Sequence, residues 1–283
     1  MKRQTSYIII ASIFLSAVVT SCEKEKDVEK VMTMTSSISG EVTISLAGTG
    51  SATIDWGDGS TSDTQDLLST ASTLYTSIVF EHNYSETNTR KIRIYGDNIT
   101  GLNCAALQLT NLDVSRNTVL KRLCCSNNQL TSLDVSNNTA LILLECGQNQ
   151  LTSLNMSKTA ALTLLDCSYN QLTNLDVSNN NALTVLFCST NQLTNLNMKY
   201  NSVLRTLDCG DNKLMSLDLS GSVMLLKLYC VTNQLSTDAL HTLFGTLHSD
   251  FIEEGKAIFI SNNPGTDYCD PFIASNKGWT VHK

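Results

Sequence analysis

Hydrophobic positions in the middle of the chain recur every 21 residues, with polar residues between them. The fullest unit reads Leu120-x-x-Leu123-x-Cys125-x-x-Asn128-x-Leu130-x-x-Leu133-x-Val135. Cysteine returns in seven units, at Cys104, Cys125, Cys146, Cys167, Cys188, Cys209 and Cys230. Asparagine follows six of them, at Asn128, Asn149, Asn170, Asn191, Asn212 and Asn233. A fixed period of this length predicts a solenoid, because one turn cannot bury its apolar residues without its neighbours.

This frame resembles the leucine-rich repeat, with cysteine in place of the third leucine. The resemblance implies a mainly β fold over residues 99–235, a right-handed solenoid with 21-residue repeats and a parallel concave sheet. The second half of each unit nearly fits the same frame, but its last position varies, at Thr159, Asn180, Asn201 and Ser222. We therefore place the concave strand on the L-x-C half, and the inverse assignment stays open.

The repeated cysteines and asparagines form a predicted structural ladder. The asparagine amides are expected to pair with inward-turned backbone groups, since a buried unpaired group costs about 1–3 kcal/mol. Zinc requires cysteine pairs that converge on one point, which one thiol per turn does not supply. Disulfides between turns need a torsion near ~90° that distorts a parallel ladder. Buried free thiols are the favoured interpretation, although pairing of some cysteines stays open.

A candidate ligand-binding patch follows from the strand assignment. Its members are exposed acidic and aromatic residues of the repeats: Glu145, Asp166, Tyr169, Phe187, Asp208, Asp211 and Tyr229. Aromatic anchors in a polar surround suit a protein hot spot or the stacking of a sugar. Scattered surface aromatics without a function are the alternative interpretation.

The N-terminus reads as an export signal. Lys2 and Arg3 precede the apolar run 8–19, which is too short to span a bilayer of ~30 Å. The end of residues 1–21 and Cys22 resemble a lipoprotein signal peptide with its acylated cysteine. Residues 22–30 form a charged tether that resembles the surface-export signals of Bacteroidota lipoproteins. The resemblance implies a lipid-anchored protein of the outer membrane at the cell surface, with a periplasm-facing orientation as the alternative.

Two further units flank the repeats. Residues 31–98 alternate in the manner of β-strands, and Trp56-Gly57-Asp58-Gly59-Ser60 followed by His82-x-Tyr84 resembles a PKD-type immunoglobulin-like sandwich. Asp58 is interpreted as a turn former and not as a calcium ligand. Residues 236–283 predict an α/β cap, with a helix that begins after Ser236 and a strand over 256–261.

Charge and motifs narrow the function. The formal net charge of −7 argues against a nucleic-acid partner. No hydrolase, zinc-protease, phosphate-loop or dinucleotide motif occurs in the sequence, so we expect no enzyme, no cofactor and no metal. The leading hypothesis is a non-catalytic surface protein that binds a protein ligand or mediates adhesion. A glycan-capturing lipoprotein of nutrient uptake is the second hypothesis, and an architectural envelope protein is the third.

Overall fold

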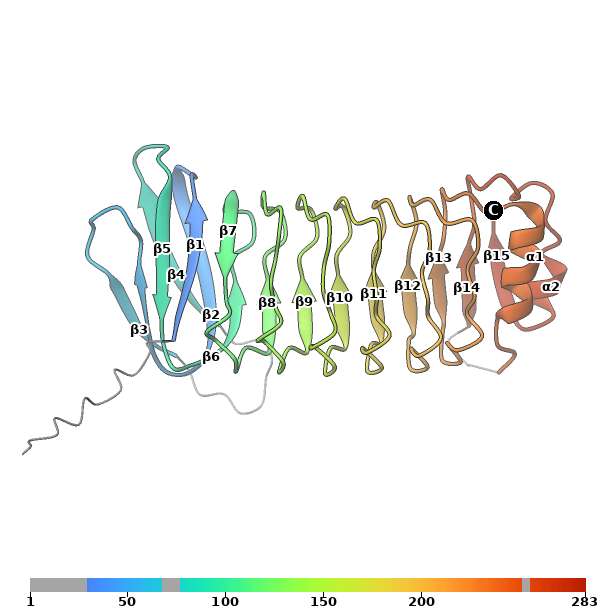
Figure 1. Cartoon of the computed structure of the whole chain (residues 1–283), viewed down its shortest axis with the longest axis horizontal. Helices are drawn as coiled ribbons and strands as arrows, with labels where there is room; N and C mark the ends of the chain where they lie inside the picture. The colour runs from blue at the N-terminus through green and yellow to red at the C-terminus, as the bar shows by residue number, and fades with distance from the viewer. Residues whose placement is uncertain (1–29, 68–76, 251–254) are drawn as a thin grey trace, which may run out of the picture.

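The computed structural model describes residues 30–67, 77–250 and 255–283. The predicted signal peptide, the tether up to residue 29 and Cys22 lie outside these residues. The described chain is mainly β and elongated, with a β unit at one end, a solenoid in the middle and two helices at the other end (Figure 1).

Each complete turn of the solenoid begins with one strand of three residues. These strands are β8 Arg122–Cys124, β9 Leu143–Glu145, β10 Leu164–Asp166, β11 Val185–Phe187, β12 Thr206–Asp208 and β13 Lys227–Tyr229. They pair in parallel, and residues 21 apart face each other across the ladder. The middle leucine of every strand is buried. The placement of the sheet on the L-x-C half is therefore confirmed.

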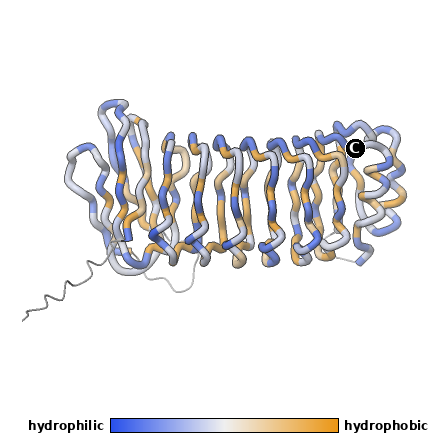
Figure 2. Tube along the Cα trace, in the orientation of Figure 1, coloured by the Kyte–Doolittle hydropathy of each residue, from blue (hydrophilic) through white to orange (hydrophobic). Residues whose placement is uncertain are grey.

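A left-handed residue ends each strand segment and turns the chain. These residues have φ between 49° and 59° and are Asn127, Gln148, Tyr169, Thr190, Asp211 and Thr232. Such a φ is uncommon for residues other than glycine. It recurs because the buried asparagine that follows holds the turn in place. Figure 2 shows hydrophobic and hydrophilic positions alternating along every turn.

The N-terminal unit contains two sheets that share one long strand. Its strands are β1 Val31–Ser36, β2 Gly40–Asp55, β3 Asp63–Leu67, β4 Ile78–Tyr84, β5 Arg90–Tyr95, β6 Asn98–Asn103 and β7 Leu109–Asp113. The first part of β2 pairs with β4 and β6, and the last part pairs with β3 and β5. β7 pairs with β1, and β6 pairs with β8 of the solenoid. Strand pairing thus crosses the predicted boundary at residue 98, and the solenoid sheet continues onto β2 and β4.

The aromatic cluster beneath this unit explains its sequence signature. The His82 ring stacks on buried Trp56 at 4.9 Å between centroids, and the Tyr84 hydroxyl donates to the Trp56 carbonyl at 2.7 Å. Asp58 accepts from the Ser60 N–H at 3.0 Å and lies 2.8 Å from the His82 ring nitrogen. These bonds, first those from Ser60, lower the pKa of Asp58 well below its usual range. Asp58 therefore forms the turn, as its sequence context indicates.

The cap extends the sheet and covers the last turn. It contains α1 Thr237–Thr246, β14 Lys256–Phe259, α2 Phe272–Ser275 and β15 Trp279–His282. The Ser236 side chain accepts from the Ala239 N–H, which is the predicted N-cap. β14 pairs in parallel with β13, and β15 with β14. Among the helices that the structure describes, none is long and apolar enough to cross a membrane.

Candidate functional site

The cysteine row lies inside the solenoid. The seven repeat cysteines are fully buried, and all nine cysteines in the described part of the chain are unpaired. Burial raises the pKa of these thiols, to about 12 for Cys230. A thiol held in its neutral form behaves as a small apolar residue and is a poor nucleophile. The row consequently contributes packing and offers no reactive group.

The asparagine row joins neighbouring turns from within. The Asn170 side-chain oxygen accepts from the Leu151 N–H at 2.9 Å. Its nitrogen donates to the carbonyls of Cys146 and Cys167, each at 3.1 Å. The same pattern recurs at Asn128, Asn149, Asn191, Asn212 and Asn233. The amide thus serves as donor and acceptor at once, and no ligand contact is left for it.

The outward side of strands β8–β15 forms one surface, which we call the strand face. One residue position of this face runs through Cys124, Glu145, Asp166, Phe187, Asp208, Tyr229, Phe259 and His282 in register. Five of the seven predicted patch residues lie in this row, which we call the mixed row. Tyr169 and Asp211 instead occupy the left-handed corners, where both are exposed. The structure therefore places the predicted patch on two neighbouring lines.

The acidic members of the mixed row are partly engaged by their own turns. One Asp166 oxygen accepts from the Ser168 N–H at 2.9 Å, and one Asp208 oxygen accepts from the Gly210 N–H at 3.0 Å. These bonds fix the direction of both carboxylates. Beside Glu145, the half-buried Cys124 has its pKa raised to about 11, by burial and then by the carboxylate. Cys124 is consequently a neutral thiol at physiological pH.

The aromatic members divide into a stack and a separate ring. Tyr229 and Phe259 stack at 4.6 Å between centroids with a 9° angle, and Phe259 and His282 stack at 4.4 Å with an 8° angle. We call Tyr229, Phe259 and His282 the aromatic stack. Phe187 lies between Asp166 and Asp208, one strand further away from Tyr229. Rings stacked along the sheet cover one another's faces, so they present their edges to a partner.

Sequence reasoning missed three residues of this region. Phe259 and His282 extend the mixed row, and Asn263 extends the asparagine ladder by donating to the carbonyls of Cys230 and Ile260, both at 2.9 Å. A signal was present, because Ile258-x-Ile260-x-x-Asn263 repeats the L-x-C-x-x-N spacing. The inserted helix α1 lengthens this turn and hides the period.

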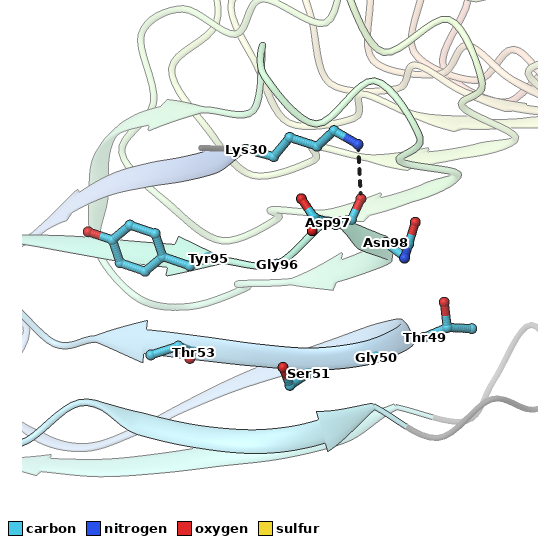
Figure 3. A pocket seen from close by; sticks show the side chains of 9 residues that line it. All are labelled: Lys30, Thr49, Gly50, Ser51, Thr53, Tyr95, Gly96, Asp97 and Asn98. Atoms are coloured by element: carbon cyan, nitrogen blue, oxygen red, sulfur yellow. Dashed lines mark hydrogen bonds between the residues drawn. The ribbon is translucent and has the colours of Figure 1, made fainter. Parts of the chain in front are cut away.

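A second candidate region is a cavity of about 710 Å³ in the N-terminal unit (Figure 3). It is lined by Lys30, Thr49, Gly50, Ser51, Thr53, Tyr95, Gly96, Asp97 and Asn98. The Lys30 ammonium donates to the backbone carbonyl of Asp97 at 3.3 Å, as the dashed line shows. Among the described residues, no group of three or more His, Cys, Asp or Glu side chains is placed to hold a metal ion.

Comparison with known structures identifies the fold. The functional domain of InlJ from Listeria monocytogenes, which includes a cysteine ladder, matches with a TM-score of 0.54 and 34% identity over 64% of this chain. A leucine-rich repeat protein from Leptospira interrogans matches with a TM-score of 0.50 and 21% identity over 60% of this chain. The matches span 38% and 44% of those two chains. No family model and no curated protein matches the chain.

The fold is therefore an internalin-like leucine-rich repeat solenoid, mainly β, with a parallel sheet built from repeats of 21 residues.

Proposed function

We propose that this chain is a non-catalytic binding protein that recognises a protein ligand on the strand face. The fold it shares with the InlJ domain supports this proposal. The strand face is also continuous, since ten strands from β4 to β15 pair side by side. A rigid sheet presents a fixed surface whose ordering cost has been met on folding, which favours recognition of a protein.

The aromatic stack carries the choice between protein and glycan. A sugar binds an aromatic ring through C–H groups that rest on the electron-rich ring face. In the aromatic stack these faces are covered at 4.4–4.6 Å. Ring edges carry partial positive charge and suit carbonyl or carboxylate oxygens of a protein. The geometry therefore favours a protein ligand over the glycan alternative.

Display at the cell surface is part of the same proposal. Cys22, after an apolar run of 12 residues at 8–19, would carry the acyl chains, and the charged residues up to 30 would form the tether. Two acyl chains or more hold a protein stably on a membrane, whereas one does not. Substituting Cys22→Ser should abolish incorporation of labelled fatty acid and release the protein from the membrane fraction. Unchanged membrane attachment of this variant would contradict the lipid anchor.

The binding role is tested by screening the purified protein against host-surface proteins, matrix proteins and polysaccharides. We expect a protein ligand whose affinity falls about 30-fold in the Phe187→Ala/Tyr229→Ala variant, the scale of a binding hot spot. Tyr200→Ala/Tyr268→Ala is the matched control, because these rings are 50% and 79% exposed and lie outside the strand face. A polysaccharide ligand lost in the first variant would establish the glycan alternative. Equal losses in both variants would place the ligand elsewhere.

A further inference from the structure

The centre of the strand face carries an aliphatic row that the candidate patch does not include. Leu143, Leu164 and Val185 begin three consecutive strands and pair in register. All three are half-buried and face outward, because the leucine that follows each of them is the one inside. Apolar side chains that line up on an outward face indicate an interaction surface.

Carboxylates run beside this aliphatic row. Glu145, Asp166 and Asp208 lie two residues further along their strands than Leu143, Leu164 and Thr206. Alternate residues of a strand point to the same side and are roughly 6.6–6.8 Å apart. An apolar line and an acidic line thus run parallel to the solenoid axis, close enough for one partner element to cover both.

The spacing of these rows decides which element fits. Adjacent strands lie about 4.8 Å apart, so the three aliphatic side chains span about 9.6 Å. Residues i and i+7 of an α-helix are about 10.5 Å apart on one face, with i+3 or i+4 between them. In an extended segment, side chains on one face recur about every 6.8 Å and span about 13.6 Å over three contacts. A helix therefore stays in register with the row to about 1 Å, and an extended segment does not.

Strand addition is also excluded at this place. β9, β10 and β11 each pair with a strand on both sides, so their backbone hydrogen bonds are occupied. A peptide that adds to a sheet requires an open edge. A second copy of the chain would bring another set of carboxylates against the first, which is unfavourable.

We propose that the strand face between β9 and β12 receives a basic amphipathic α-helix of a partner protein, lying along the solenoid axis. Its apolar stripe packs on Leu143, Leu164 and Val185, and its lysine or arginine residues meet Glu145, Asp166 and Asp208. This inference rests on the proposed function and specifies the chemistry of the partner.

The test uses a synthetic helical peptide of about 18 residues, long enough to be partly helical in water. Leucines occupy one stripe and lysines the adjacent stripe, and a second peptide has glutamate in place of lysine. Fluorescence anisotropy measures binding of each to the purified protein. We expect the lysine peptide to bind at least about tenfold more tightly than the glutamate peptide at low salt.

Matched variants separate the strand face from general acidity. Glu145→Gln/Asp166→Asn/Asp208→Asn should weaken binding of the lysine peptide about tenfold, and Leu164→Ser by a similar factor. The control is Asp134→Asn/Asp176→Asn/Asp218→Asn, which removes the same charge from the opposite side of the solenoid. Asparagine already fills that position at Asn155 and Asn197, so the control variant should fold.

Three outcomes would overturn the inference. One is equal weakening by both triple variants, because the peptide would then follow net charge only. Another is equal binding of the lysine and glutamate peptides. The third is a dimer in sedimentation that Leu164→Ser dissociates, since a second copy would then cover the face. If a protein ligand from the screen still depended on Phe187 and Tyr229, the proposed function would stand while the helical partner would not.

Discussion

The two halves of each repeat have similar sequences but solve the burial of polar groups differently. In the strand half, asparagine occupies the ladder position in six consecutive turns. In the half that returns to the next strand, the equivalent buried positions are Asn117, Asn138, Thr159, Asn180, Asn201 and Ser222. We call these two sets the strand ladder and the return ladder. The difference between them is one of hydrogen-bond arithmetic.

The strand ladder uses the whole amide, whereas the return ladder uses only its donor. Asn180 donates to the Thr159 carbonyl at 2.8 Å and to the Met156 carbonyl at 3.3 Å. Its side-chain oxygen, like that of Asn117, Asn138 and Asn201, has no partner among the described residues. Thr159 fits the same position because its hydroxyl donates to the Met156 carbonyl at 3.0 Å. A position that asks for one donor tolerates several side chains, and a position that asks for a donor and an acceptor keeps asparagine.

Alanine substitution in each ladder should give the largest contrast. Asn170→Ala leaves the Leu151 N–H and two carbonyls without the amide, and should lower the free energy of unfolding by about 3 kcal/mol or more. Asn180→Ala also removes an oxygen that is itself unpaired, so its loss should be about 1 kcal/mol. Urea unfolding of both variants, followed by circular dichroism, measures the difference. Equal losses would show that the two ladders contribute alike.

Threonine substitution sharpens the same contrast at a smaller scale. Asn180→Thr places in one turn the residue that Thr159 places in the turn before, and should change stability by less than about 1 kcal/mol. Asn170→Thr cannot both accept from Leu151 and reach two carbonyls, and should cost about 2 kcal/mol. The ratio of the two losses in urea is the measurement. A neutral Asn170→Thr would remove the explanation for the invariant strand ladder.

Thiol labelling compares how readily the two halves open. Cys167 lies in the strand half and Val177 in the return half of the same turn, and both are buried. If the return half opens at about 1.4 kcal/mol less, Val177→Cys should introduce a thiol that is alkylated about tenfold faster than Cys167 in the same protein. Mass spectrometry of the labelled peptides gives both rates. Faster labelling of Cys167 would reverse the order of stability.

The smallest effect concerns pH. The N–H and hydroxyl groups of Ser136, Ser178 and Ser220 lower the pKa values of Asp134, Asp176 and Asp218 on the return side. A lowered folded-state pKa contributes stability above the unfolded value of about 3.9, and this is lost as pH falls through the folded value. Because these carboxylates are exposed, the total should not exceed about 1 kcal/mol. Asp134→Asn/Asp176→Asn/Asp218→Asn should flatten the stability profile below about pH 4. A profile identical to that of the parent protein would exclude this contribution.

The sequence alone determined the solenoid, because its period is written into every turn. Leucine, cysteine and asparagine recur in register, so a single rule fixes the inward residues, the strand half and the parallel pairing. The capping helix was equally readable, since Ser236 and the stripe of Leu240, Leu243 and Phe244 are local signals. Local periodicity is visible in sequence because each element's own residues carry it.

Only the tertiary structure decided the composition of the strand face. The 30-residue step from Asn233 to Asn263 conceals that the cap supplies further strands, so Phe259 and His282 entered the mixed row unpredicted. Sequence distance also gave no sign that β6 joins β2 to the solenoid sheet. Whether aromatic rings present faces or edges depends on the neighbours across the sheet. These contacts lie between residues remote in sequence, where no local pattern records them.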